Sequence, residues 1–70
     1  MDREAIEEAL RTAYRKFLYA VFKSYGEEQC RQKGNIKVLS ESLMNNFGLT
    51  QEDVEAIIAD EALKGTRKAG

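Results

Sequence analysis

Apolar side chains recur at steps of three and four residues over the first third of the chain, which is the period of an α-helix. Asp2 precedes this stretch as a suitable N-cap, and the acids next to it suit the positive end of a helix dipole. Gly26 comes directly after the last apolar position and is a typical helix stop. The pattern predicts a helix that runs to residue 25, about 23 residues or roughly 35 Å long. Its broad apolar stripe consists of Ile6, Leu10, Ala13, Tyr14, Phe17, Leu18, Val21, Phe22 and Tyr25.

The middle of the chain divides into a polar segment and a second apolar one. Residues 27–34, EEQCRQKG, have no apolar face and predict a linker or a single helical turn closed by Gly34, with Asn35 able to cap the next element. A second helix is expected within 36–47 and should end at Gly48, although its first three residues also suit a short extended segment. Its apolar face consists of Ile36, Leu39, Leu43, Met44 and Phe47.

Thr50 and Asp53 indicate the start of a third helix, because a Thr N-cap with an acid three positions later approximates a capping box. Gly65 is the expected stop of this helix, and 66–70 predict a disordered basic tail. The pattern therefore indicates a single all-α domain over residues 1–65. The apolar face of the third helix consists of Val54, Ile57 and Ile58.

Charged residues form blocks, although the net charge is only −1. Basic residues dominate 11–37, whereas 38–63 contains six acids and no Lys or Arg. Either the two halves attract each other in the folded protein, or an acidic and a basic face meet different partners. Glu61 falls near the apolar face of the third helix, and we expect it to pair with a basic residue of the first helix or to fray outward.

The first helix offers more apolar surface than two short helices can cover. We therefore expect an exposed remainder that binds another protein or a second copy in a homodimer. Side chains three and four residues apart form a ridge along the edge of this surface. Tyr and Arg are typical interface anchors, so the expected partner-binding residues are Arg11, Arg15, Tyr19 and Phe22. A solvated helix face with stacked Arg–Tyr pairs is the alternative. No membrane contact is expected, because acids occupy the first turns of the same helix.

The residue types also limit the available chemistry. The 70 residues allow one domain, and with Cys30 as the single cysteine and no His, neither an internal disulfide nor a zinc site can form. Without His, or a nucleophile paired with a base, we expect no catalysis, no cofactor and no small-molecule substrate. No apolar run approaches the roughly 20 residues that span a membrane, so we expect a cytoplasmic protein.

Residues 40–58, SESLMNNFGLTQEDVEAII, resemble the helix-turn-helix segment of DNA-binding proteins. The resemblance implies that Thr50 and Gln51 read bases while Lys37 contacts phosphate. A glycine in the turn allows a left-handed backbone, and the leucine after it fills the corner. The positions that carry the resemblance are Met44, Gly48 and Val54, completed by Leu43, Phe47, Leu49 and Ile57.

Two features depart from that family's pattern. Met44 is bulkier than the usual alanine or glycine, and no Lys or Arg lies between Val38 and Leu63 to neutralise phosphate. Alternatively, the corner only closes the core, with one long N-terminal helix packed against it, or its acidic face meets a basic protein patch. That face consists of Glu52, Asp53 and Glu55. The leading expectation is a small non-enzymatic protein-interaction protein, such as a regulator, inhibitor or accessory subunit. The alternative is a helix-turn-helix DNA-binding regulator.

Overall fold

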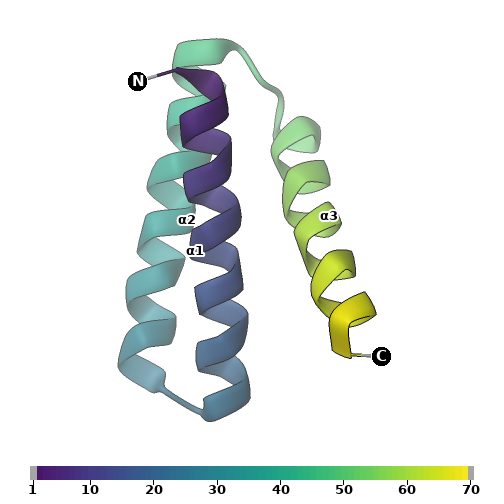
Figure 1. The fold of residues 1–70 in the computed structure, drawn as a ribbon. Coiled ribbons are helices and arrows are strands. Elements are labelled where there is room, and N and C mark those ends of the chain that lie inside the picture. The colour runs from purple at the N-terminus through teal and green to yellow at the C-terminus, as the bar shows by residue number, and fades with distance from the viewer. Residues whose placement is uncertain (1, 70) are drawn as a thin grey trace.

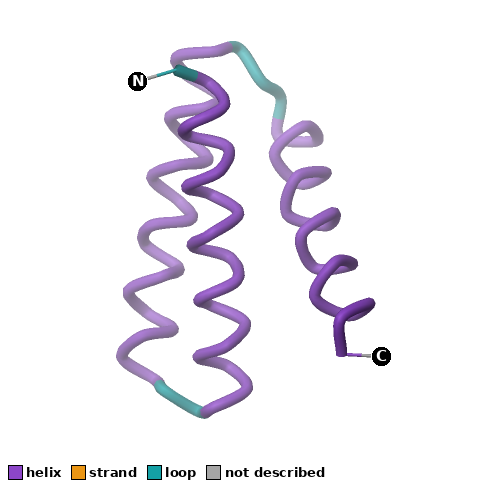
Figure 2. The backbone as a smooth tube through the Cα atoms, viewed as in Figure 1, coloured by secondary structure: helices purple, strands orange, loops and turns teal. Residues whose placement is uncertain are grey.

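Three helices make up the protein in the computed structural model, which describes the backbone of residues 2–69 and the side chains of 2–64. They are α1 (Arg3–Lys23), α2 (Gly26–Phe47) and α3 (Gln51–Ala69). The chain runs down α1, back up α2 and down α3 in the view of Figure 1. Over residues 2–69 the elements are helices joined by short loops, with no strand (Figure 2). The predicted all-α fold of three helices is confirmed.

The ends of α1 show one correct prediction and one error. The Asp2 carboxylate accepts a hydrogen bond from the Ala5 N–H (2.9 Å), which confirms the predicted N-cap. The helix ends at Lys23, because Ser24 adopts a left-handed conformation (φ 62°). The Ser24 N–H then donates to the Val21 carbonyl (3.2 Å) and the Tyr25 N–H to the Ala20 carbonyl (2.8 Å). These two bonds form a Schellman motif. The predicted stop at Gly26 is wrong, since this residue begins α2.

Residues 27–34 are helical and continue through Gly34 into the rest of α2, so the predicted linker or single turn is wrong. They form the first half of α2, which is one residue longer than α1, and Asn35 and the segment 36–38 also lie inside this helix. Glu27 and Glu28 stabilise its first turn through the helix dipole. Gln32 is buried (5% exposed), and its carbonyl oxygen accepts a hydrogen bond from the Asn35 amide (3.2 Å). The buried face here is polar, which is why apolar periodicity does not reveal it.

The connection from α2 to α3 forms as predicted. Gly48 ends α2 with a left-handed backbone (φ 71°), and Leu49 is buried. The Thr50 hydroxyl accepts from the Asp53 N–H (3.1 Å), while the Asp53 carboxylate accepts from the Thr50 N–H (2.9 Å), which confirms the capping box. The predicted stop at Gly65 is wrong, because the backbone of α3 is helical to Ala69. The side chains of the predicted basic tail, 66–70, are not among those described.

The hydrophobic core lies at one end of the molecule, where α1 begins, α2 ends and α3 begins. Leu10 and Leu43 at its centre are fully buried. In the second half of α1 the buried residues are small, Ala13 and Ala20, and α2 offers Gln32 in place of an aliphatic side chain. The large apolar residues of that half are therefore left largely outside the core. The buried cluster consists of Ile6, Leu10, Leu43, Leu49, Val54 and Ile57.

Candidate partner-binding surface

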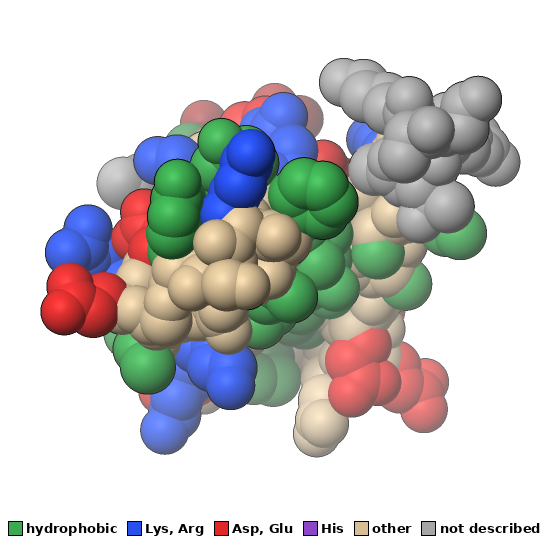
Figure 3. Space-filling model, turned by 90° about the horizontal axis from the view of Figure 1, so that it is seen from below, with side chains coloured by type: hydrophobic (Ala, Val, Ile, Leu, Met, Phe, Trp, Pro, Cys, Tyr) green, Lys and Arg blue, Asp and Glu red, His purple; other side chains and the backbone are tan. Residues whose placement is uncertain are grey.

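Large apolar side chains are exposed where α1 turns into α2, and we call this group the hairpin end. It consists of Tyr19, Val21, Phe22 and Tyr25, which are 58, 47, 82 and 54% exposed. Figure 3 views the molecule from below, and hydrophobic and basic side chains gather on this face. We expected part of the first helix's stripe to stay uncovered, and it does, but the expected reason is wrong. The second helix is long enough to cover the stripe, but its facing half is polar.

Lysines surround the hairpin end. The Nζ atom of Lys23 lies 5.8 Å from the ring centroid of Tyr19 and 5.7 Å from that of Phe22, close enough for cation–π attraction. Lys33 reaches from α2 over the ring of Phe17 (6.0 Å). Lys16 is exposed one turn before Tyr19. Among the described residues, none of these lysines pairs with a carboxylate. The surface is therefore both apolar and positively charged.

A shallow hollow of about 510 Å³ adjoins the hairpin end. Tyr19 and Tyr25 form one side of it and meet edge to face, with ring centroids 6.5 Å apart. Since rings and basic groups share this hollow, it can seat an apolar side chain with an acid beside it. The residues that line it are Thr12, Arg15, Lys16, Tyr19, Tyr25 and Glu28.

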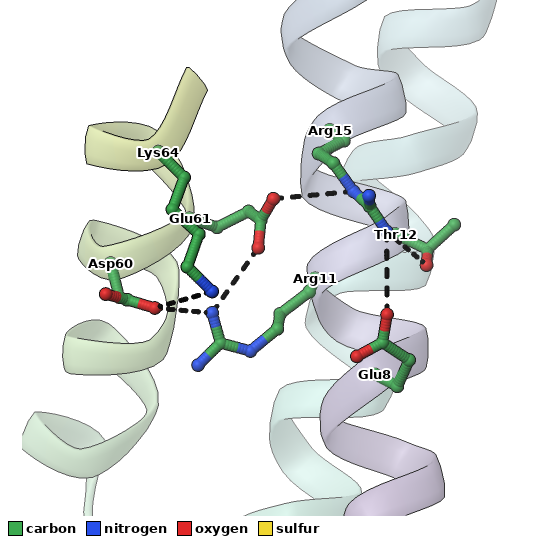
Figure 4. Close-up of polar contacts among 7 residues, drawn as sticks. All are labelled: Glu8, Arg11, Thr12, Arg15, Asp60, Glu61 and Lys64. Atoms are coloured by element: carbon green, nitrogen blue, oxygen red, sulfur yellow. Dashed lines mark hydrogen bonds and ion pairs between the residues drawn. The ribbon is translucent and has the colours of Figure 1, made fainter. Parts of the chain in front are cut away.

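Arg11 joins α1 to α3 farther from the hairpin end (Figure 4). Its Nη1 lies 2.7 Å from Asp60 Oδ2 and 3.3 Å from Glu61 Oε1. The hydrogen bond with Asp60 raises the pKa of Arg11, and the same bond, with a second one from Lys64, lowers the pKa of Asp60. The predicted pairing of Glu61 with a basic residue of the first helix is confirmed.

Arg15 continues this cluster by one turn (Figure 4). Its Nε lies 3.4 Å from Glu61 Oε2, and its Nη2 donates to the Thr12 hydroxyl (3.1 Å) and pairs with Glu8 (3.6 Å). The Glu61 side chain is only 8% exposed, so two arginines balance a carboxylate within the apolar face of α3. Apolar packing and ion pairs together hold α3 against α1.

The four predicted partner-binding residues thus occupy two environments. Tyr19 and Phe22 lie exposed at the hairpin end, whereas Arg11 faces α3 and Arg15 both faces α3 and lines the hollow. Sequence reasoning did not include Lys23. Its position, four residues after Tyr19, is the spacing at which two side chains meet on a helix, and this signal was available.

The residues predicted to form an acidic face or to contact DNA all lie at the surface. Asp53 caps α3, and the bond from the Thr50 N–H lowers its pKa. The Gln51 amide donates to Glu55 (3.2 Å), so the predicted base-reading groups already have hydrogen-bond partners within α3. The other predicted residues in these two sets, Glu52 and Lys37, are exposed.

Comparison with protein-family models, curated proteins and solved structures finds no match to this chain. Within its described residues, no helix has both the length and the apolar character needed to cross a membrane. The surface chemistry of the chain itself is therefore the basis for assigning a function.

Proposed function

We propose that this chain is a small, non-enzymatic protein-interaction protein that binds a partner protein through the hairpin end. One observation carries the proposal: the aromatic side chains of Tyr19, Phe22 and Tyr25 are exposed where α1 turns into α2, although the core of the same small protein lies at its other end. Contiguous exposed apolar surface, with polar groups around it, is typical of interaction sites. Tyrosine and phenylalanine are also among the residues enriched at the centres of interfaces.

Phe22 is the most exposed side chain of the hairpin end, and a partner could bury it. It is 82% exposed, so it contributes little to the stability of the isolated fold. Burying such a side chain fully in a complex contributes about 1.5–3 kcal/mol. Tyr19 and Tyr25 add aromatic area and hydroxyl groups that can hydrogen-bond at the edge of the contact.

Site-specific photo-crosslinking in the native host tests this proposal. A benzoylphenylalanine residue replaces Phe22 in one variant and Val38 in the control, since Val38 is also exposed (66%) but lies along α2. We expect a discrete protein adduct from position 22 that position 38 does not give. An excess of unlabelled wild-type protein should compete with the adduct, and an excess of the Phe22→Ala variant should not. No adduct at position 22, or the same adducts from both positions, would refute the proposal.

DNA binding is the alternative function, and the left-handed Gly48 with buried Leu49 is the observation that favours it. The acidic start of α3 opposes it, because phosphate neutralisation supplies much of the affinity for DNA. In an anisotropy titration with duplex DNA at about 150 mM salt, we expect only the weak binding of a non-specific protein, with Kd roughly 10⁻⁴–10⁻⁶ M. Tighter, sequence-selective binding that Gln51→Ala abolishes would establish the alternative.

A further inference from the structure

We infer that the partner binds with an amphipathic α-helix whose apolar residues are flanked by Asp and Glu. The inference rests on the proposed function and specifies the chemistry of the partner. The docking surface is a strip along α1 that includes part of the hairpin end. Its members share one face of the helix and are Thr12, Arg15, Lys16, Tyr19, Phe22 and Lys23.

The protein already binds one helix of this kind, its own α3. The start of α3 is acidic and its Val54 and Ile57 are buried, while Arg11 and Arg15 hold its carboxylates Asp60 and Glu61. Further along α1, exposed Tyr19 and Phe22 again place large apolar side chains beside basic ones, Lys16 and Lys23. This second combination uses aromatic rings and lysines where the contact with α3 uses aliphatic side chains and arginines.

Among the described residues, Arg15 of the strip is paired with Glu8 and Glu61, so the uncompensated charge of the strip belongs to its lysines. Each arginine with a described side chain has an ion-pair partner; Arg3 pairs with Glu7, and Arg31 with Glu28, for example. Lys16 and Lys23 have none among the described residues. A partner with carboxylates at matching positions gains attraction that a basic or neutral partner does not.

The acids near the strip are already paired with arginines. Glu8 lies 3.6 Å from Arg15, and Glu61 lies 3.4 Å from the same arginine. Glu28, at the hairpin end itself, is already paired with Arg31, which leaves Glu27 as the opposing charge nearby.

The shape of the strip favours a helix as the occupant. From Thr12 to Lys23 it spans about three helical turns, roughly 17 Å. Side chains at these steps form a ridge, and a partner helix packs its own ridges beside it. The hollow next to Tyr19 offers a seat for one apolar anchor.

A second copy of this chain does not supply such a helix. Its α3 is acidic, but the apolar residues Val54 and Ile57 are buried in its own core. Two copies meeting strip to strip would bring Lys16 and Lys23 of one against those of the other. Like charges in close contact oppose that arrangement.

Two designed helical peptides provide the probe. Each has about 18 residues, five turns, with leucines along one face; one carries Glu on both flanks and the other carries Lys at the same positions. Binding to the full chain is followed by anisotropy and mapped by NMR amide shifts. We expect the Glu peptide to bind at the strip, at least about tenfold more tightly than the Lys peptide and more weakly as salt is raised.

Three variants test the residues involved. The double variant Lys16→Glu/Lys23→Glu should reverse the preference for the Glu peptide, and Phe22→Ala should weaken binding of that peptide about fivefold or more. Val38→Ala, at an exposed apolar position outside the strip, should change nothing. Thermal melts of each variant confirm that it is folded.

Several outcomes overturn the inference: equal binding of both peptides, no binding of the Glu peptide, or amide shifts away from the strip. If the Glu peptide does not bind, two further results would identify another occupant of the strip. Phe22-dependent sedimentation with phosphatidylserine vesicles would indicate a membrane, and a Phe22-dependent dimer in sedimentation velocity would indicate a second copy. A position-22 crosslink to a partner surface that is not an acidic helix leaves the proposed function standing and removes this inference. Absence of both crosslink and peptide binding removes both.

Discussion

Replacing Gly34 by alanine should stabilise the protein. Gly34 lies in the interior of α2, and a Cβ built on it meets no atom within 4 Å. Among the glycines with described backbone angles, only Gly48 has a positive φ, so an alanine fits position 34 without strain. If 27–34 were instead the linker that the sequence suggests, the same change would bring no helical benefit.

The size of the effect depends on the cost of glycine in a helix. An interior glycine destabilises a helix by about 0.5–1 kcal/mol relative to alanine, through its backbone entropy in the unfolded chain. No steric term opposes the gain here, so the free energy of unfolding should rise by about the same amount. For a domain of this size, that corresponds to an increase in Tm of roughly 2–8 °C.

Urea and thermal unfolding followed by far-UV circular dichroism measure this change. Gly48→Ala is the matched control, because its left-handed backbone (φ 71°) should make alanine destabilising by about 1–2 kcal/mol. Gly26→Ala, at the first position of α2, should have a smaller effect than Gly34→Ala. A Gly34→Ala protein that is no more stable than wild type would refute a continuous helix through this position.

Four further changes test the core, the ion-pair cluster and the cap of α3. Leu43→Ala should lower the free energy of unfolding by about 2–5 kcal/mol in urea titrations, because Leu43 is fully buried. Glu61→Ala should cost about 1–3 kcal/mol by the same measurement, since it removes the buried carboxylate that Arg11 and Arg15 share, whereas exposed Glu27→Ala should cost almost nothing. Thr50→Ala should cost about 1 kcal/mol through loss of the cap, measured as a lower urea midpoint. The lowered pKa of Asp53 stabilises the fold above the ordinary Asp pKa, and this contribution is lost as pH falls through the folded value. The Asp53→Asn variant should therefore lose less stability than wild type below about pH 4. In thermal melts at decreasing pH, the Tm of the variant and that of wild type should converge.

The sequence predicted the elements whose signals are local. The apolar period of α1, the Asp2 cap, the Gly48 turn and the box of Thr50 and Asp53 all depend on neighbours within four residues. The first half of α2 was missed because its buried side chain is Gln32, an amide satisfied by polar neighbours. A polar helix interface of this kind leaves no hydrophobic pattern to read.

Only part of the candidate partner-binding surface could be predicted from the sequence. Tyr19 and Phe22 stand out as aromatics at the edge of a stripe, and both are exposed. The separation of Arg11 from them depends on Asp60, which lies 49 residues away in the chain. Local spacing carries no information about such a contact, so only the folded structure distinguishes the arginine held by α3 from the lysines that remain available.

The position of the core at one end also determines how the native protein opens. Amide hydrogens near Leu10, Leu43 and Val54 should exchange only on global unfolding, because exposing them requires breaking the packed cluster. Around Ser24 and Tyr25 few buried side chains oppose local fraying, so exchange there should be fast. The surface proposed for docking therefore extends to a part of the molecule that opens at a lower free energy than the core. A bound helix would slow exchange most at this end, and the protein would become more uniformly rigid when occupied.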